Sequence, residues 1–153
     1  MTRYPREEIF AALFAQAQLA STATTPFAVL SRRYVPFSER TNLEAAELYQ
    51  VELNQSGKQT GHFGLTKWDM KALWVCYFPV NTDDLKTPTS PTLNNYLDAL
   101  EAALQPVTGA GPKQTLGGLV NNAFIDGEVI IDEGLNSGPP ALISIPITIN
   151  VGM

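Results

Sequence analysis

The sequence is poor in the residues on which most catalytic and metal sites depend. Its 153 residues include one cysteine, Cys76, and one histidine, His62, and only 16% of the side chains are charged. A lone cysteine forms no internal disulfide, which fits a reducing compartment. Ordinary domains carry about 25% charged residues, so we expect part of this surface to be buried against something else.

Long apolar runs are also absent. None approaches the length of about 20 residues that a membrane-spanning helix needs, so no membrane partner is expected. The hydrophobic content of 44% excludes intrinsic disorder. The net charge of -5 disfavours a protein that binds nucleic acid through its phosphates, because such binding needs clustered Lys and Arg. The length predicts one domain over residues 1–153 with a single core.

Basic side chains are missing from the end of the chain. All ten Lys and Arg residues lie before Gln114, and four acidic residues follow it: Asp126, Glu128, Asp132 and Glu133. In the simplest interpretation these carboxylates are solvated. In two others they contact the basic pair Arg32-Arg33 of a neighbouring subunit, or line a channel through which a polyanion slides without sticking. Both of these imply assembly.

Enzymatic chemistry has little support in the sequence. Ser-His or Cys-His catalysis needs a base beside the nucleophile, and His62 lies in a glycine-flanked loop where a base is poorly preorganised. Cys76 lies in an apolar stretch, where a thiol is an inert core residue with a raised pKa. We expect no catalytic residue and no enzyme, and a small hydrolase or ligand-binding domain using His62 is a distant alternative.

Acidic pairs offer the only route to a metal site. None of them has the ligand spacing of a calcium loop: Asp83-Asp84, Asp126 with Glu128, and Asp132-Glu133. Gly117-Gly118 lacks the pattern of a phosphate-binding loop, so we interpret it as a bulge or a close approach of backbone. The sequence predicts no metal and no cofactor.

Hydrophobic spacing predicts two helices. The first begins at Pro5 and fades from Ser21 onward, and the second runs over 90–104 with a stripe of leucines on one face. Residues 79–91 are polar and rich in proline, which indicates a long loop before the second helix.

The remaining segments have the pattern of strands. We predict strands over 27–37, which contains Arg32-Arg33, over 48–53 and over 65–78, with a hairpin loop at 54–64. Asp126-Gly127 predicts a tight turn between strands 119–125 and 128–132. Five β-branched residues alternate over 143–151, so this strand buries one face, and Pro146 favours an edge or a bulge there. The sum is an α+β fold, a mostly antiparallel sheet of about five or six strands with two helices on one face.

Several of these segments together resemble a known family. They are SRR (31–33), LN (93–94), LDALEAAL (97–104), QTLGGLV (114–120), IDG (125–127), DEGL (132–135) and IPI (145–147). In this combination the chain resembles the tail terminators, or tail completion proteins, of tailed bacteriophages. The likeness spans most of the chain, and its motifs are structural. The family often has an aromatic or histidine pair where this chain has Asn121-Asn122, so no role is carried over to these two residues.

The resemblance implies a structural virion protein at the joint of tail and head, assembled in the host cytoplasm. Members form a hexameric ring that caps the tail tube, ends its polymerisation and offers a surface to the head connector. DNA passes through the ring without specific binding. The partners implied are copies of the chain, the tail tube protein and the connector or adaptor protein. A head-to-tail adaptor is the alternative of the same structural class.

Overall fold

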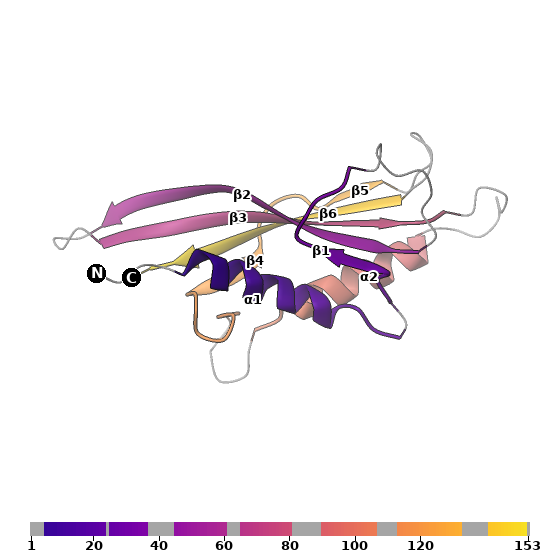
Figure 1. Ribbon diagram of the computed structural model, residues 1–153, viewed down its shortest axis with the longest axis horizontal. Coiled ribbons are helices and arrows are strands. Elements are labelled where there is room, and N and C mark those ends of the chain that lie inside the picture. Colours follow the sequence, from indigo (N-terminus) through magenta and orange to yellow (C-terminus); the bar gives the residue numbers. More distant parts are fainter. Residues whose placement is uncertain are drawn as a thin grey trace.

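The structure, a computed structural model, describes residues 5–23, 25–36, 45–60, 65–80, 90–106, 113–132 and 141–152. The elements in chain order are α1 (Arg6–Leu19), β1 (Val29–Ser31), β2 (Glu47–Thr60), β3 (Leu65–Phe78), α2 (Ser90–Ala103), β4 (Asn122–Ile125), β5 (Ile130–Asp132) and β6 (Ala141–Val151). Both helices lie on the same side of one six-stranded sheet (Figure 1). The predicted α+β fold is confirmed.

The order of the strands defines the two edges of the sheet. The order is β1-β2-β3-β6, and both β4 and β5 pair with the outer side of β6. β1 runs parallel to β2, and every other pair is antiparallel. One edge therefore consists of β1 and β2, and the other of β4 followed by β5.

The main core fills the space between the helices and the sheet. The predicted alternation in β6 is confirmed, since five of its residues are at most 3% exposed: Ile143, Ile145, Ile147, Ile149 and Val151. They share one cluster with Leu13 of α1, Leu100 of α2 and Trp74 of β3. Helical spacing in α1 and α2 thus produces two apolar stripes that bury one face of the sheet.

A smaller cluster covers the opposite face of the sheet. Tyr49, Val75 and Tyr77 are buried there, and the hydroxyls of Tyr34 and Tyr77 are hydrogen-bonded at 2.7 Å. The end of β3 is therefore buried on both faces, as its continuous apolar sequence predicts.

The strand predicted over 27–37 is much shorter in the structure. Only Val29–Ser31 pairs with β2. The hydroxyl of Ser31 accepts a hydrogen bond from the backbone N–H of Arg33 at 3.0 Å. This local bond competes with sheet pairing, so the strand ends before the two arginines.

The hairpin loop predicted over 54–64 is also wrong in extent. β2 continues to Thr60 and pairs with β3, with a shift of register between Glu52 and Gln55. Gly57 is required on this ribbon because a Cβ there would lie 2.9 Å from the ring of Trp68. Residues 61–64, with His62, lie outside the described residues, as does 81–89 of the predicted loop over 79–91.

The turn predicted at Asp126-Gly127 does not fold β4 back onto β5. Both strands pair with β6 instead, β4 with 147–150 and β5 with 142–144. Pro146 lies at the break, where it has no N–H to donate, and its carbonyl accepts from Asp126 N at 3.0 Å. Gly127 has φ 120°, and a Cβ there would lie 3.3 Å from Pro146. The sequence predicted that Pro146 places β6 at an edge or a bulge. In the structure β6 is an inner strand, and Pro146 lies opposite the break between β4 and β5.

Gly117-Gly118 marks a turn, and the predicted bulge or close approach is wrong. Their φ angles are 74° and 90°, and a Cβ on either residue would meet nothing within 4 Å. The left-handed backbone explains the two glycines.

Candidate subunit interface

The candidate interface residues lie at opposite edges of the sheet. Arg32 and Arg33 directly follow β1, whereas Asp126 and Glu128 lie between β4 and β5, and Asp132 ends β5. Glu133 lies outside the described residues. One subunit therefore does not bring its basic pair and its acidic group together.

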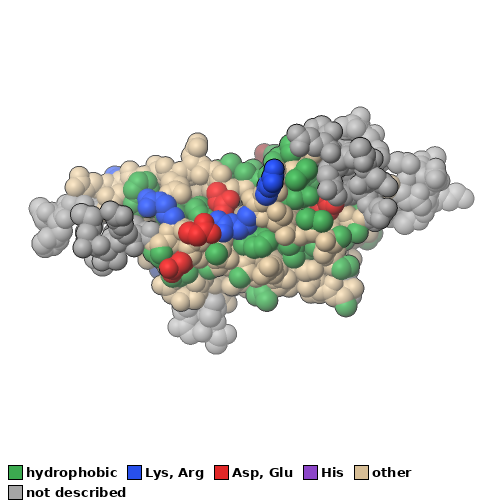
Figure 2. Space-filling view, in the orientation of Figure 1, with side chains coloured by type: hydrophobic (Ala, Val, Ile, Leu, Met, Phe, Trp, Pro, Cys, Tyr) green, Lys and Arg blue, Asp and Glu red, His purple; other side chains and the backbone are tan. Residues whose placement is uncertain are grey.

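Arg32 is bound by two carboxylates of its own chain. It donates to Glu52 Oε1 from Nη2 at 2.6 Å and from Nε at 2.9 Å, and its guanidinium also bonds both oxygens of Glu7. This bonding raises the pKa of Arg32, and the hydrogen bond from Arg32 lowers the pKa of Glu7. On the face drawn in Figure 2, acidic and basic side chains lie in contact in this region. Arg32 therefore ties α1 to β2 and is not available to a neighbour.

Arg33 differs from Arg32 in that no ion pair between described residues includes its charge. Its side chain is exposed, and its guanidinium forms none of the ion pairs found among the described residues. Of the predicted basic pair, Arg33 alone offers a positive charge at the β1 edge.

Asp126 is likewise held within its own subunit. Its Oδ2 accepts from Thr148 Oγ1 at 2.8 Å and from Lys71 Nζ at 3.3 Å. The hydrogen bond from Thr148, followed by that from Lys71, lowers the pKa of the Asp126 carboxyl. This carboxylate therefore fastens the loop after β4 to β3 and β6.

The lowered pKa of Asp126 predicts a pH-dependent contribution to stability. A carboxyl whose folded pKa is lowered stabilises the fold above its unfolded value of about 3.9, and this contribution is lost as pH falls through the folded pKa. We expect the gap in urea midpoint between the wild type and Asp126→Asn to be present at about pH 6 and to shrink below about pH 4. A gap that is the same at both pH values would contradict this role.

The β5 edge carries a feature that the sequence interpretation missed. Ile130 and Ile131 are 56% and 46% exposed, and Glu128 beside them is exposed. Adjacent β-branched residues point to opposite faces of a strand, and both remain uncovered here. The signal in the sequence is that two consecutive isoleucines break the alternation of apolar and polar residues in this segment.

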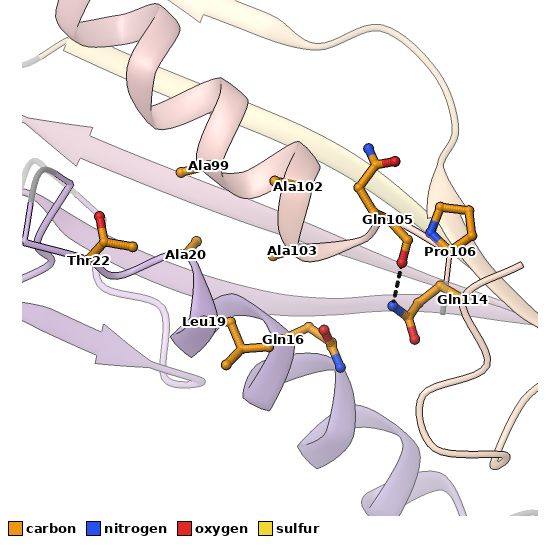
Figure 3. Close-up of a pocket in the computed structure, with 10 residues that line it drawn as sticks. All are labelled: Gln16, Leu19, Ala20, Thr22, Ala99, Ala102, Ala103, Gln105, Pro106 and Gln114. Carbon is orange, nitrogen blue, oxygen red and sulfur yellow. Dashed lines mark hydrogen bonds between the residues drawn. The ribbon is translucent and has the colours of Figure 1, made fainter. Parts of the chain in front are cut away.

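A groove of about 450 Å³ lies where the C-terminal ends of α1 and α2 approach each other (Figure 3). Its lining consists of alanines with Leu19, Thr22, Pro106 and three glutamines. One of these, Gln114, donates to the carbonyl of Gln105 at 2.8 Å, which bonds the end of α2. Among the described residues, this lining contains no charged side chain.

Three further sequence predictions concern Cys76, metal binding and the membrane. Cys76 is fully buried, and burial raises the pKa of its thiol, which confirms the interpretation as core. The described part of the chain holds no group of three His, Cys, Asp or Glu side chains placed to bind a metal. Neither α1 nor α2 is long and apolar enough to cross a membrane.

The sequence was compared with models of known protein families and with curated proteins. No model of a known protein family matches it, and no curated protein matches it.

Proposed function

We propose that this protein is a structural component of a phage tail, a terminator that assembles into a ring on the end of the tail tube. The ring stops further addition of tube subunits and provides the surface that joins tail to head. The chain carries no catalytic role in this proposal.

The observation that carries the proposal is the separation of charges across one sheet. The β1 edge presents Arg33, and the β5 edge presents Glu128 beside two exposed isoleucines. Two different, complementary patches on opposite sides of a subunit permit head-to-tail contacts, and such contacts close into a ring when the rotation between copies is suitable. A symmetric dimer would instead need one self-complementary patch.

The composition and the sequence motifs support the same function. A ring subunit buries two side surfaces and two end surfaces, which accounts for a charged fraction of 16%. A net charge of -5 suits a ring that DNA traverses, because a negative surface does not hold the phosphates. The motifs that resemble the tail terminators lie at the end of β1, in α2, in the segment that leads into β4, and at β4, β5 and β6.

Assembly is the first test of this function. We expect native mass spectrometry to show a single closed oligomer of the purified chain, formed alone or on addition of tail tube protein. Electron microscopy should then show rings at tube ends. A chain that remains monomeric and does not bind tube ends would overturn the proposal.

Phage that lack the protein separate the terminator from the adaptor. Abnormally long tails are expected for a terminator, because nothing stops tube growth. Filled heads beside unattached tails of normal length would assign the chain to the head-to-tail adaptor instead.

A further inference from the structure

We propose that β5 of one subunit pairs, antiparallel, with β1 of the next, with Glu128 and Arg33 at the same end of the contact, so that the sheet continues from copy to copy around the ring. The inference rests on the proposed function and specifies its interface. The occupant of the β5 edge is thus a second copy of this chain.

The two edge strands lie at the same level of the sheet. One row of paired residues crosses it through five strands: Leu30, Leu48, Cys76, Ile143 and Ile131. β1 and β5 each have three residues, and each residue of β1 is connected in this way, through β2, β3 and β6, to one residue of β5. A neighbour placed beside the molecule without a shift along the strands therefore brings β1 next to β5.

The strand directions make this contact antiparallel. β1 runs with β2, and each step from β2 to β3, β6 and β5 reverses the direction. β5 therefore runs opposite to β1 in one subunit. Copies related by rotation about an axis along the strands keep these directions, so β5 meets β1 of the next copy in the antiparallel sense.

The hydrogen-bond pattern turns the backbone of Ile131 outward. The carbonyls of Asn150 and Pro146 accept from Asn121 and Asp126 on the outer side of β6. Because successive residues of a strand face opposite neighbours, Ile143 bonds toward β3. Ile131, which lies opposite Ile143, therefore directs its N–H and C=O away from β6.

The same reasoning applies at the β1 edge. Ala46 accepts from Ala28 at 2.7 Å, so the even-numbered residues at the start of β2, including Leu48, face β1. In a parallel pair, a residue that faces its neighbour bonds to the residues on either side of the one opposite. Leu30, opposite Leu48, then directs its own N–H and C=O outward. Leu30 and Ile131 therefore match as a hydrogen-bonding pair across the contact.

This register, which follows from the backbone hydrogen bonds alone, also places opposite charges at one end of the contact. With Ile131 opposite Leu30 of the next copy, Ile130 lies opposite Ser31. Glu128, which precedes β5, and Arg33, which follows β1, then lie beyond the same end of the paired residues. Both charged side chains are exposed, and neither forms one of the ion pairs found within the described residues. Opposite charges that face each other across an interface favour the contact and help to fix its register. The contact would also cover Ile130 and Ile131.

Disulfide trapping tests the register. Ser31 and Ile130 form a non-hydrogen-bonded pair, whose Cα separation of about 4.5 Å suits a disulfide. We expect Ser31→Cys with Ile130→Cys, oxidised under conditions where native mass spectrometry shows the closed oligomer, to give a ladder of covalent oligomers on a non-reducing gel. The matched control is Ser31→Cys with Ile131→Cys, whose cysteines face opposite sides and are expected not to react. Cys76 does not compete because it is fully buried.

The outcomes separate this inference from the proposed function. Closed oligomers without the covalent ladder, or with an equal ladder in the control, would overturn the β5–β1 pairing and leave the terminator function standing. Absence of any oligomer, also with tube protein, would overturn both.

Charge reversal gives a second readout. Glu128→Arg alone and Arg33→Glu alone are each expected to weaken assembly about tenfold per contact, and the double variant is expected to recover it. Glu101→Arg, an exposed substitution on α2, is the control and should assemble as the wild type does. Circular dichroism verifies that each variant is folded. Failure of the double variant to recover assembly would contradict the pairing.

Discussion

Leu13→Ala is expected to lower the free energy of unfolding by about 3 kcal/mol. Leu13 is fully buried in the cluster that joins α1 to the sheet. Truncation there removes favourable apolar burial and leaves a cavity, because the stiff sheet below collapses only in part. Urea denaturation followed by circular dichroism measures the change in the free energy of unfolding.

Leu19→Ala is the matched control on the same helix. Leu19 is 67% exposed beside the groove of Figure 3, so its truncation is expected to change the free energy of unfolding by less than about 0.5 kcal/mol. Equal losses for both variants would mean that the two-layer packing of α1 on the sheet is wrong.

Gln50→Leu is expected to cost about 2 kcal/mol, although it increases the apolar content of the core. The fully buried Gln50 amide donates to the carbonyl of Phe10 at 3.0 Å and accepts from Trp74 Nε1 at 3.1 Å. Leucine leaves the buried indole N–H without an acceptor, and an unpaired buried donor is costly. Urea midpoints of the wild type and variant give the difference.

A double-mutant cycle with Trp74→Phe isolates this hydrogen bond. We expect a coupling of about 1 kcal/mol or more between the two sites, since either change removes the same bond. Gln55→Leu is the control on the same strand, and we expect a loss below about 1 kcal/mol, because Gln55 is only partly buried. Additive effects of Gln50→Leu and Trp74→Phe would show that the bond contributes nothing.

Elements with strong periodicity were predicted well. Leucines at helical spacing place α2 at Ser90–Ala103, and alternation of β-branched residues places β6 at Ala141–Val151. Both patterns are local, so they can be recognised without knowing what the element packs against.

Segments without such a pattern were predicted poorly. The end of β2 carries glycine and amides, and nothing local distinguishes it from a loop, yet its pairing with β3 makes it a strand. The turn residues Asp126-Gly127 have the sequence of a hairpin, but the two flanking strands, β4 and β5, both pair with β6 and not with each other. Long-range pairing overrides local preference in both cases.

The surroundings of the candidate interface residues could be predicted only in part. The asymmetry of charge is visible in the sequence and marks the segments that contain Arg33 and Glu128. The sequence holds no sign that Glu7 and Glu52, from two other elements, bind Arg32, or that Lys71 and Thr148 bind Asp126. These partners are distant along the chain, so only folding reveals which charges remain free.

The sequence by itself therefore determined the two helices, the buried face of β6 and the uneven distribution of charge, because each is written in local composition or spacing. Only the tertiary structure decided the order of the strands, because backbone pairing depends on which distant segments meet. That order places β1 and β5 at opposite ends of the same rows of paired residues. It therefore separates Arg33 from Glu128, the two charges that an assembly of copies would bring together.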